Sequence, residues 1–210
     1  MDYRLAIEST PDTVPGGTGI LLLHPSTGET DRIDTDFLKT DTDHMLVIST
    51  RTTAREVRQK LEHYEVDEDK ATILDTISVE RGYTRRASEN VQYVAAPDDL
   101  QGIVDRTEVF LESHEGKRRV SFDSLTDFLE SHEGKRRVSF DSLTEMIYYA
   151  DADAAHEAVE AVLELLDEHD AVGLFHLAKG VHEDPLIEEF AALFDGVVEL
   201  DEDGTVSSEF

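Results

Sequence analysis

The residues of this sequence most able to do chemistry lie in the octapeptide Leu23–Thr30, LHPSTGET, which directly follows an apolar run. A phosphate-binding loop reads G-x-x-x-x-G-K-[ST]: backbone N–H groups wrap the phosphates, the lysine neutralises them and the hydroxyl binds Mg²⁺. Gly28 and Thr30 stand at the second glycine and the hydroxyl positions, whereas Leu23 and Glu29 replace the first glycine and the lysine. An anion there would repel a triphosphate in a poorly solvated pocket. Taken alone, the octapeptide fits an ordinary strand-to-helix turn better.

The elements around this octapeptide predict its setting. Short apolar, β-branched runs alternate with amphipathic stretches, which is typical of a mostly parallel sheet with helices on its faces. The predicted strands are Ile20–Leu23, Met45–Ser49, Ala71–Leu74, Val91–Ala95, Val120–Phe122, Val138–Phe140, Val172–Leu177 and Val197–Leu200. A chain of 210 residues has room for one such domain. We therefore expect a single three-layer α/β domain over residues 1–210.

Helices are predicted between these strands. They span about Thr53–Tyr64, Pro97–Ser113 and Ala154–Glu168, and a last one runs from Pro185 to a point before Asp195. In the first helix, Glu56 and Lys60 have the i,i+4 spacing of an ion pair. In the third, Asp151 or Asp153 can cap the amino end.

One segment occurs twice. FLESHEGKRRVSFDSLT fills residues 110–126 and recurs unchanged at 128–144, with only Asp127 between the copies. We interpret the pair as a local tandem duplication. The interval between the two strand copies is close to the minimum of roughly 10 to 12 residues for a βαβ crossover. We expect one copy in the core and one displaced, because an added central strand would separate neighbours that already pack; a sheet holding both is the alternative, and the sequence leaves open which copy is in the core.

The composition limits the functions open to this chain. Asp and Glu number 48 against 19 Lys plus Arg, for a formal net charge of −29. Salt mutes the resulting self-repulsion, since the Debye length falls to about 3 Å at 1 M, and the composition resembles that of salt-in haloarchaeal proteins. Nucleic-acid binding needs cations to neutralise phosphates, so it is not expected. Without cysteine or a membrane-length apolar stretch, we expect a cytoplasmic protein with no disulfide, thiolate metal site or membrane insertion.

Several segments carry a resemblance to known ATPases. RRVSFDSLTEMIYYAD resembles the Walker B strand and following helix of KaiC-like ATPases of the RecA superfamily. HMLVISTRTTAREVRQKLEHY and ATILDTIS resemble their second and third strands around a helix. AVGLFHLAKGVHEDPLIEEFAALFDGVVELDEDG resembles their terminal strand, short helix and closing hairpin. The resemblance covers nearly the whole chain in the correct order, is closest to haloarchaeal proteins described as HTR-like, and implies a P-loop-NTPase-type fold.

The resemblance also exposes departures from that family. KaiC-like ATPases place acidic catalytic residues just after the second strand, where this chain has Arg51 and Thr52. The Walker B aspartate survives in one of the two repeat copies, although Asp-Ser at a strand end is also a good helix cap. The resemblance thus implies a vestigial nucleotide site, for ATP and Mg²⁺ without turnover, at Ser26, Thr27, Gly28, Thr30, Asp123 and Asp141.

Other polar residues give weaker signals. His176 lies in an apolar run and is expected to be a hydrogen-bonded core residue and not a metal ligand. The clusters 117–119 and 135–137, each Lys-Arg-Arg, are the densest positive patches. Such clusters are commonly solvated or paired with carboxylates. Because they stand out in a chain whose net charge is −29, they are also candidate docking points for an acidic partner.

These observations lead to one main functional prediction and two alternatives. The main prediction is a non-hydrolysing RecA/KaiC-like regulatory or signalling module that acts through protein partners, further copies of this chain included. One alternative is a nucleotide sensor without hydrolysis. The other is an ATPase whose lysine comes from elsewhere, such as Lys39 or Lys179.

Overall fold

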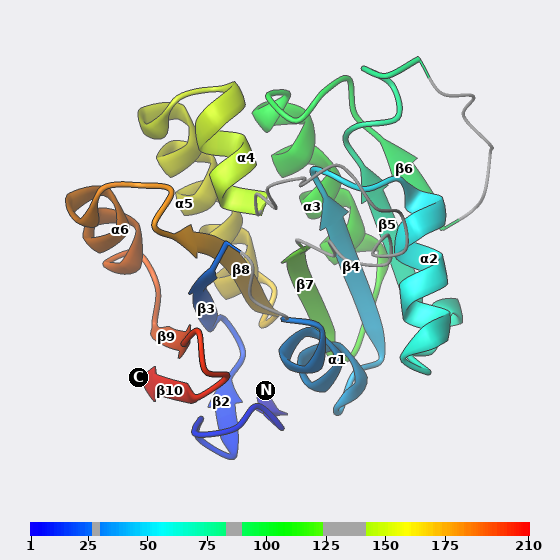
Figure 1. Ribbon diagram of the computed structural model, residues 1–210. Helices are drawn as coiled ribbons and strands as arrows, with labels where there is room; N and C mark the ends of the chain where they lie inside the picture. The colour runs from blue at the N-terminus through cyan, green and yellow to red at the C-terminus, as the bar shows by residue number, and fades with distance from the viewer. Residues whose placement is uncertain (27–29, 83–89, 124–141) are drawn as a thin grey trace.

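A computed structural model describes residues 1–26, 30–82, 90–123 and 142–210. Within these residues, eight strands form one sheet in the order β10-β9-β3-β8-β7-β4-β5-β6 (Figure 1). The strands are β3 (Gly19–Pro25), β4 (His44–Ser49), β5 (Ala71–Asp75), β6 (Val91–Tyr93), β7 (Arg118–Asp123), β8 (Val172–Lys179), β9 (Gly196–Leu200) and β10 (Val206–Glu209). All neighbours are parallel except β10, which runs antiparallel to β9. A separate hairpin consists of β1 (Asp2–Arg4) and β2 (Thr13–Pro15).

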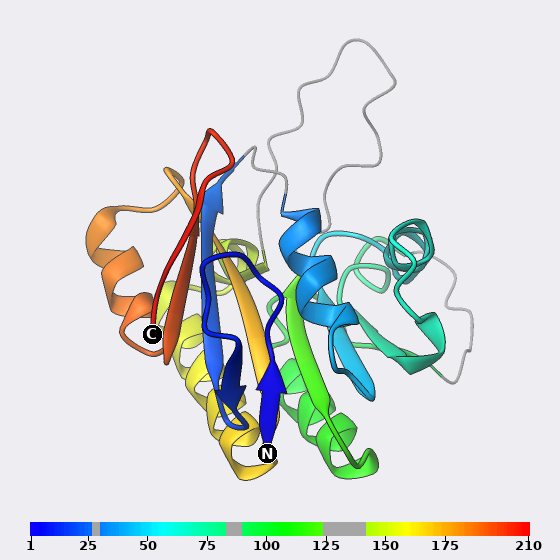
Figure 2. The ribbon, with the colours of Figure 1, turned by 90° about the horizontal axis from the view of Figure 1, so that it is seen from below.

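Helices cover both faces of the sheet (Figure 2). On one face lie the β1–β2 hairpin, α1 (Asp31–Lys39) and α2 (Ala54–His63), which share one hydrophobic cluster with the sheet. The other cluster contains side chains of α3 (Leu100–Ser113), α4 (Ser142–Tyr149), α5 (Ala152–Glu168) and α6 (Asp184–Ala191). A short 3₁₀ turn, η1, spans Glu68–Lys70. The predicted three-layer, mostly parallel α/β architecture is confirmed.

The central strands form because their side chains are apolar on both sides. All seven residues of β3 are buried. Ile20 and Leu22 join the cluster under α1 and α2, whereas Leu21 and Leu23 join the cluster under α3 to α6. Continuous apolar runs of this kind are what a parallel sheet covered on both faces requires. The predicted strands therefore fall on observed strands wherever the structure describes them.

Helix starts carry the polar residues that satisfy free backbone groups. Asp151 caps α5 by accepting a 2.8 Å hydrogen bond from Ala154 N, as predicted. Thr53 and Glu56 form a capping box at α2, with Glu56 Oε2 accepting from Thr53 N at 2.8 Å. The predicted Glu56–Lys60 ion pair is wrong: Lys60 is buried and instead places Nζ 3.2 Å from Asp31 Oδ1 of α1. Lys60 thus pairs with a carboxylate of another helix and not with Glu56 of its own helix.

The sequence did not predict α1 or the β1–β2 hairpin. Helix α1 has the sequence DRIDTDFLK, in which only Ile33, Phe37 and Leu38 supply buried apolar side chains. The two hairpin strands have three residues each, too short to show an alternating pattern.

Within the residues that the structure describes, the repeat contributes the strand β7 to the sheet. Copy one ends α3 and forms β7, which is paired on both sides, with β4 and with β8. No second strand fits between those neighbours in the part of the sheet that the structure describes. The predicted strand Val138–Phe140 lies outside the described residues, so only copy one is placed in the core.

Candidate functional site

The parallel strands end at one edge of the sheet, where the described residues of the predicted site, Ser26, Thr30 and Asp123, are found. Ligands of open α/β sheets bind at this carboxyl edge. The predicted phosphate loop follows β3, and Asp123 is the last residue of β7, with its Cα opposite that of Ser49 in β4. Strand β8 lies between β3 and β7. Ser26 is half-buried and Thr30 is buried, while Thr27, Gly28 and Asp141 lie outside the described residues.

Helix α1 begins directly after this loop, with Thr30 at its N-cap position and no side-chain cap. A helix amino end with free N–H groups attracts anions such as phosphate. Here the first turn carries its own carboxylates, Asp31 and Asp34. Negative side chains at this position are stabilised by the helix dipole, and they occupy the positive field that a phosphate would need.

Both carboxylates are bound within the fold. Asp31 lies 3.2 Å from the buried Lys60 Nζ and accepts a 2.6 Å hydrogen bond from Tyr64 OH, which ties α1 to α2. Asp34 is 2 % exposed, and its Oδ1 lies 2.8 Å from Nε2 of the fully buried His176 in β8. The expectation that His176 is a hydrogen-bonded core residue is therefore confirmed.

A second histidine completes this buried polar cluster. His24 of β3 is 2 % exposed, and its ring meets that of His176 edge-on, with centroids 5.5 Å apart. His24 Nδ1 lies 2.9 Å from the carbonyl oxygen of Pro25. The cluster connects β3, β8 and α1. Among the described residues, no three His, Cys, Asp or Glu side chains are placed to hold a metal ion.

The turn after β4 is fixed by hydrogen bonds. Arg51 and Thr52 stand there, as predicted from the sequence. Ser49 Oγ accepts from Thr52 N at 3.2 Å and lies 2.9 Å from Thr52 Oγ1. Thr76 Oγ1 donates to Ser49 O at 3.0 Å. The chain directly after β4 therefore forms a hydrogen-bonded turn and carries the cationic side chain of Arg51.

Asp75, at the end of β5, is the main polar residue that sequence reasoning missed. Its buried carboxylate accepts hydrogen bonds from Ala54 N at 2.7 Å, Ile77 N at 3.1 Å and Ser78 N at 2.8 Å. Ser78 Oγ donates a fourth at 2.7 Å. Asp75 therefore joins the start of α2 to the turn after β5. The available signal was an Asp-Thr-Ile-Ser run directly after an apolar strand.

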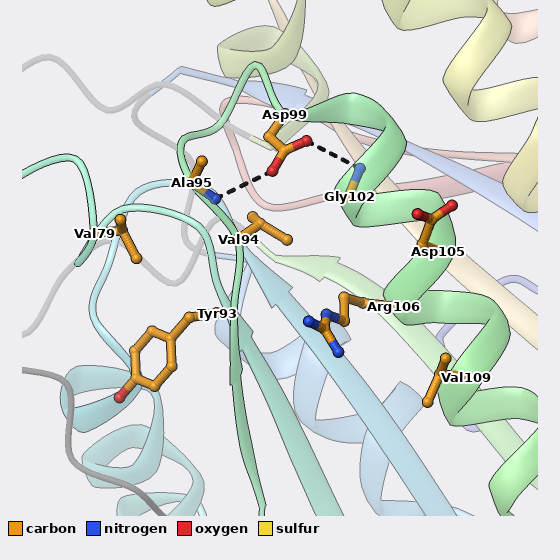
Figure 3. Close-up of a pocket in the computed structure, with 9 residues that line it drawn as sticks. All are labelled: Val79, Tyr93, Val94, Ala95, Asp99, Gly102, Asp105, Arg106 and Val109. Carbon is orange, nitrogen blue, oxygen red and sulfur yellow. Dashed lines mark hydrogen bonds between the residues drawn. The ribbon is translucent and has the colours of Figure 1, made fainter.

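A cavity of about 500 Å³ lies elsewhere, beside the edge strand β6 (Figure 3). Tyr93 and Arg106 face it from β6 and α3, and Asp99 closes one end by accepting from Gly102 N at 3.1 Å and Ala95 N at 3.2 Å. None of the described residues of the predicted site, Ser26, Thr30 and Asp123, lines it.

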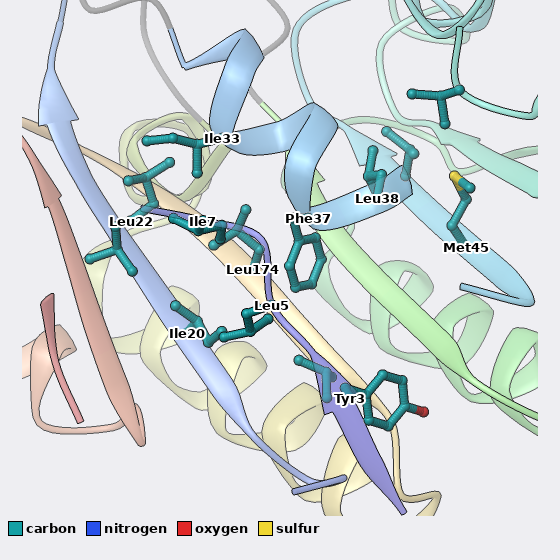
Figure 4. Close-up of a cluster of buried hydrophobic side chains, with 14 of the residues drawn as sticks. Tyr3, Leu5, Ile7, Ile20, Leu22, Ile33, Phe37, Leu38, Met45 and Leu174 are labelled. Carbon is teal, nitrogen blue, oxygen red and sulfur yellow. The ribbon is translucent and has the colours of Figure 1, made fainter. Parts of the chain in front are cut away.

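The basic cluster of copy one is not a docking surface. Arg119 is fully buried between Tyr3 and Phe37, with its guanidinium carbon 5.3 and 4.7 Å from the two ring centroids (Figure 4 shows both rings). Burial lowers the pKa of Arg119 to about 10. Arg118 Nη1 donates to Leu111 O at 2.8 Å, and Lys117 pairs with Asp41. The interpretation of residues 117–119 as docking points is therefore wrong, because the fold uses these charges itself; residues 135–137 lie outside the described residues.

Comparison with known proteins assigns the chain to a family. The model of a family of unknown function, DUF7090, matches residues 1–129 and 126–210. The chain belongs to this family. The two DUF7090 matches overlap at residues 126–129, at the boundary between the two repeat copies. No curated protein matches this DUF7090 chain in sequence.

Solved structures show the fold. A protein of Pyrococcus horikoshii OT3 matches with a TM-score of 0.56 and 9% identity, covering 92% of this chain and 86% of its own. An ATPase from the type III secretion system of pathogenic bacteria matches with a TM-score of 0.53 and 14% identity; the match covers 91% of this chain but 53% of the ATPase. The chain therefore has a P-loop-NTPase-like fold. Among the described residues, no helix is long and apolar enough to cross a membrane.

Proposed function

We propose that this chain is a non-hydrolysing, RecA/KaiC-like regulatory or signalling module that acts through protein partners in a haloarchaeal cytoplasm. The P-loop-NTPase-like fold supplies the scaffold, and its phosphate-binding chemistry is replaced by internal contacts. The observation that carries the proposal is the first turn of α1, which places the carboxylates Asp31 and Asp34 at the positive helix end that would face a phosphate.

Two further positions support the loss of hydrolysis. Glu29 stands where the phosphate loop has lysine. Arg51 and Thr52 stand after β4, where Thr52 is bound to Ser49. Removing a lysine and adding carboxylates act in the same direction, because each lowers the electrostatic potential at the triphosphate position.

Phosphate release tests the proposal directly. The chain is incubated with ATP and Mg²⁺ in multimolar KCl, beside a D123N/D141N variant that removes both candidate metal-binding aspartates. We expect both proteins to release phosphate at the rate of buffer alone. Turnover by the parent chain that the double variant abolishes would contradict the proposal and favour an ATPase with a non-standard loop.

Nucleotide sensing without hydrolysis is the second candidate. It is favoured by Thr30, which keeps the hydroxyl position of the loop and lies at the start of α1. A thermal-shift titration with ATP and Mg²⁺ separates the candidates, since a ligand at 100 times its Kd stabilises by about 2.7 kcal/mol. We expect no shift for the parent chain and a shift for an E29K/D31N variant, which exchanges two anions for a cation and an amide. A saturable shift in the parent would favour the sensor.

A further inference from the structure

The described core reads as one uninterrupted copy of the repeat. Copy one supplies the end of α3 and all of β7, up to Asp123. The described chain resumes at Ser142, where α4 begins, and Ser142 is the copy-two counterpart of Ser124. The interval 124–141 is eighteen residues long, which equals the repeat period from position 110 to position 128. The core sequence therefore passes from SFD of copy one to SLT of copy two as if a single copy were present.

The contacts that hold β7 are made mostly with residues outside the repeat. Arg119 lies between the Tyr3 and Phe37 rings, and its Nη2 donates to Arg4 O at 2.6 Å. Lys117 pairs with Asp41. Val120 is fully buried and sits opposite Leu46 of β4. None of these partners belongs to either copy, so either copy can use them.

We propose that the two copies are interchangeable in the core, so that residues 132–141 can occupy the β7 position in place of residues 114–123. Lys135, Arg137 and Val138 would then take the places of Lys117, Arg119 and Val120, and residue types along the strand would be unchanged. Because Ser142 follows Asp141 directly, α4 would keep its start. The packed core would be chemically identical in the two arrangements.

The fold offers two places where the additional eighteen residues interrupt no helix or strand. One is the connection from β7 to α4, at the carboxyl edge of the sheet. The other is the turn from α3 to β7 at the amino edge, where Gly116 has a φ of 86°. Excluding eighteen residues that begin within α3 or β7 would interrupt that element. The connection that carries the additional residues would have 18 residues at the carboxyl edge (124–141) and 22 at the amino edge (114–135). Because the entropic cost of closing a loop grows only slowly with its length, the two arrangements compete closely in free energy.

The exchange must be slow. Strand β7 is bonded to β4 and β8, and both ladders must open before another segment can replace it. The copy in use is therefore selected as the chain folds, and it decides at which edge of the sheet the additional residues leave the core.

A charged residue in the buried strand tests this redundancy. Asp in place of a buried valine puts an unpaired charge into the core and unfolds the protein. V172D in β8 should show this by losing the cooperative thermal transition. We expect V120D to lower the Tm by only about 5 °C or less, since V138 of copy two remains available. V138D should behave likewise, and the double variant V120D/V138D should unfold like V172D. If V120D alone behaves like V172D, the proposal is overturned.

A distance measurement shows which copy is in use. The chain has no cysteine, so spin labels can be placed at E68C, exposed at the amino edge beside β5, and at D127C. Asp127 lies between the copies and is excluded from the core in either arrangement. The label at position 127 should lie at the amino edge in V120D and at the carboxyl edge in V138D, about 20 Å apart along a six-residue strand, and the parent should show both distances. Folded V120D and V138D with the same label distance would overturn the proposal.

Discussion

At the scale of single residues, this protein stabilises charges in its interior by pairing them across elements. The contact between Asp34 and His176 joins helix α1 to strand β8, and both side chains are buried. Buried polar groups contribute to stability only while they are satisfied, and removing one partner leaves the other without its bond.

D34A is expected to destabilise the fold by about 1–3 kcal/mol, because it leaves the His176 Nε2 without this bond in the interior. Denaturant unfolding measures the change. Asp36, on the same helix, supplies the matched control: burial raises the pKa of its carboxyl, so D36A should be neutral or slightly stabilising. Equal losses for the two variants would mean that Asp34 contributes no more to stability than the half-buried carboxylate of Asp36.

Acidification acts on His44 in a defined direction. Burial, helped by the nearby His114 ring, holds the pKa of His44 below its usual value near 6.5. The unfolded chain therefore takes up this proton before the folded chain does, and the contribution of His44 to stability is lost as the pH falls below about 6.5. H44Q should show a smaller drop in Tm than the parent between pH 7 and 5, measured at constant KCl.

At the scale of elements, polar residues at strand ends set how the layers connect. The carboxylate of Asp75 accepts three backbone N–H bonds and one hydroxyl bond, which hold the start of α2 against the turn after β5. D75A should cost about 3 kcal/mol or more, because it leaves several buried N–H groups unpaired. T53A, which removes an exposed part of the same helix cap, should cost about 1 kcal/mol. Hydrogen exchange at Ala54 and Ser78 should rise in D75A; unchanged exchange there would contradict this role.

The elements also show what the sequence could reveal. The central strands β3, β4, β5 and β8 were predictable because each contains a continuous apolar run, and the fold class followed from the alternation of strands with helices. Helix α1 was not predictable, because Lys60 and His176, which bind its acidic residues, come from distant parts of the chain. The one available signal was that Asp34 precedes Leu38 by four residues and so shares its buried face. Arg118 and Arg119 were misread for the same reason: a basic cluster in sequence does not show that aromatic rings and carbonyl oxygens will enclose it.

At the scale of the whole molecule, the formal charge of −29 must be screened for the fold to persist. The outer side of α5 is one source of this repulsion, with Glu157, Glu164 and Glu168 exposed on a single helix. Ions in solution weaken repulsion between exposed charges once the Debye length falls below their separation, about 10 Å at 0.1 M and 3 Å at 1 M. The stability of the chain should therefore rise steeply with KCl.

Neutralising part of that helix should reduce the salt requirement. We expect the Tm of the parent to rise across a KCl series, and the Tm of an E157Q/E164Q/E168Q variant to rise less steeply because fewer like charges remain to be screened. The charge-preserving variant E157D/E164D/E168D controls for the changed side chains and should keep the parent's slope, whatever its absolute Tm. If the Tm of all three proteins rises by the same amount per step of KCl, the repulsion along α5 is not the cause of the salt dependence. The dependence must then come from hydrophobic burial, which is also strengthened by salts that are excluded from the protein surface.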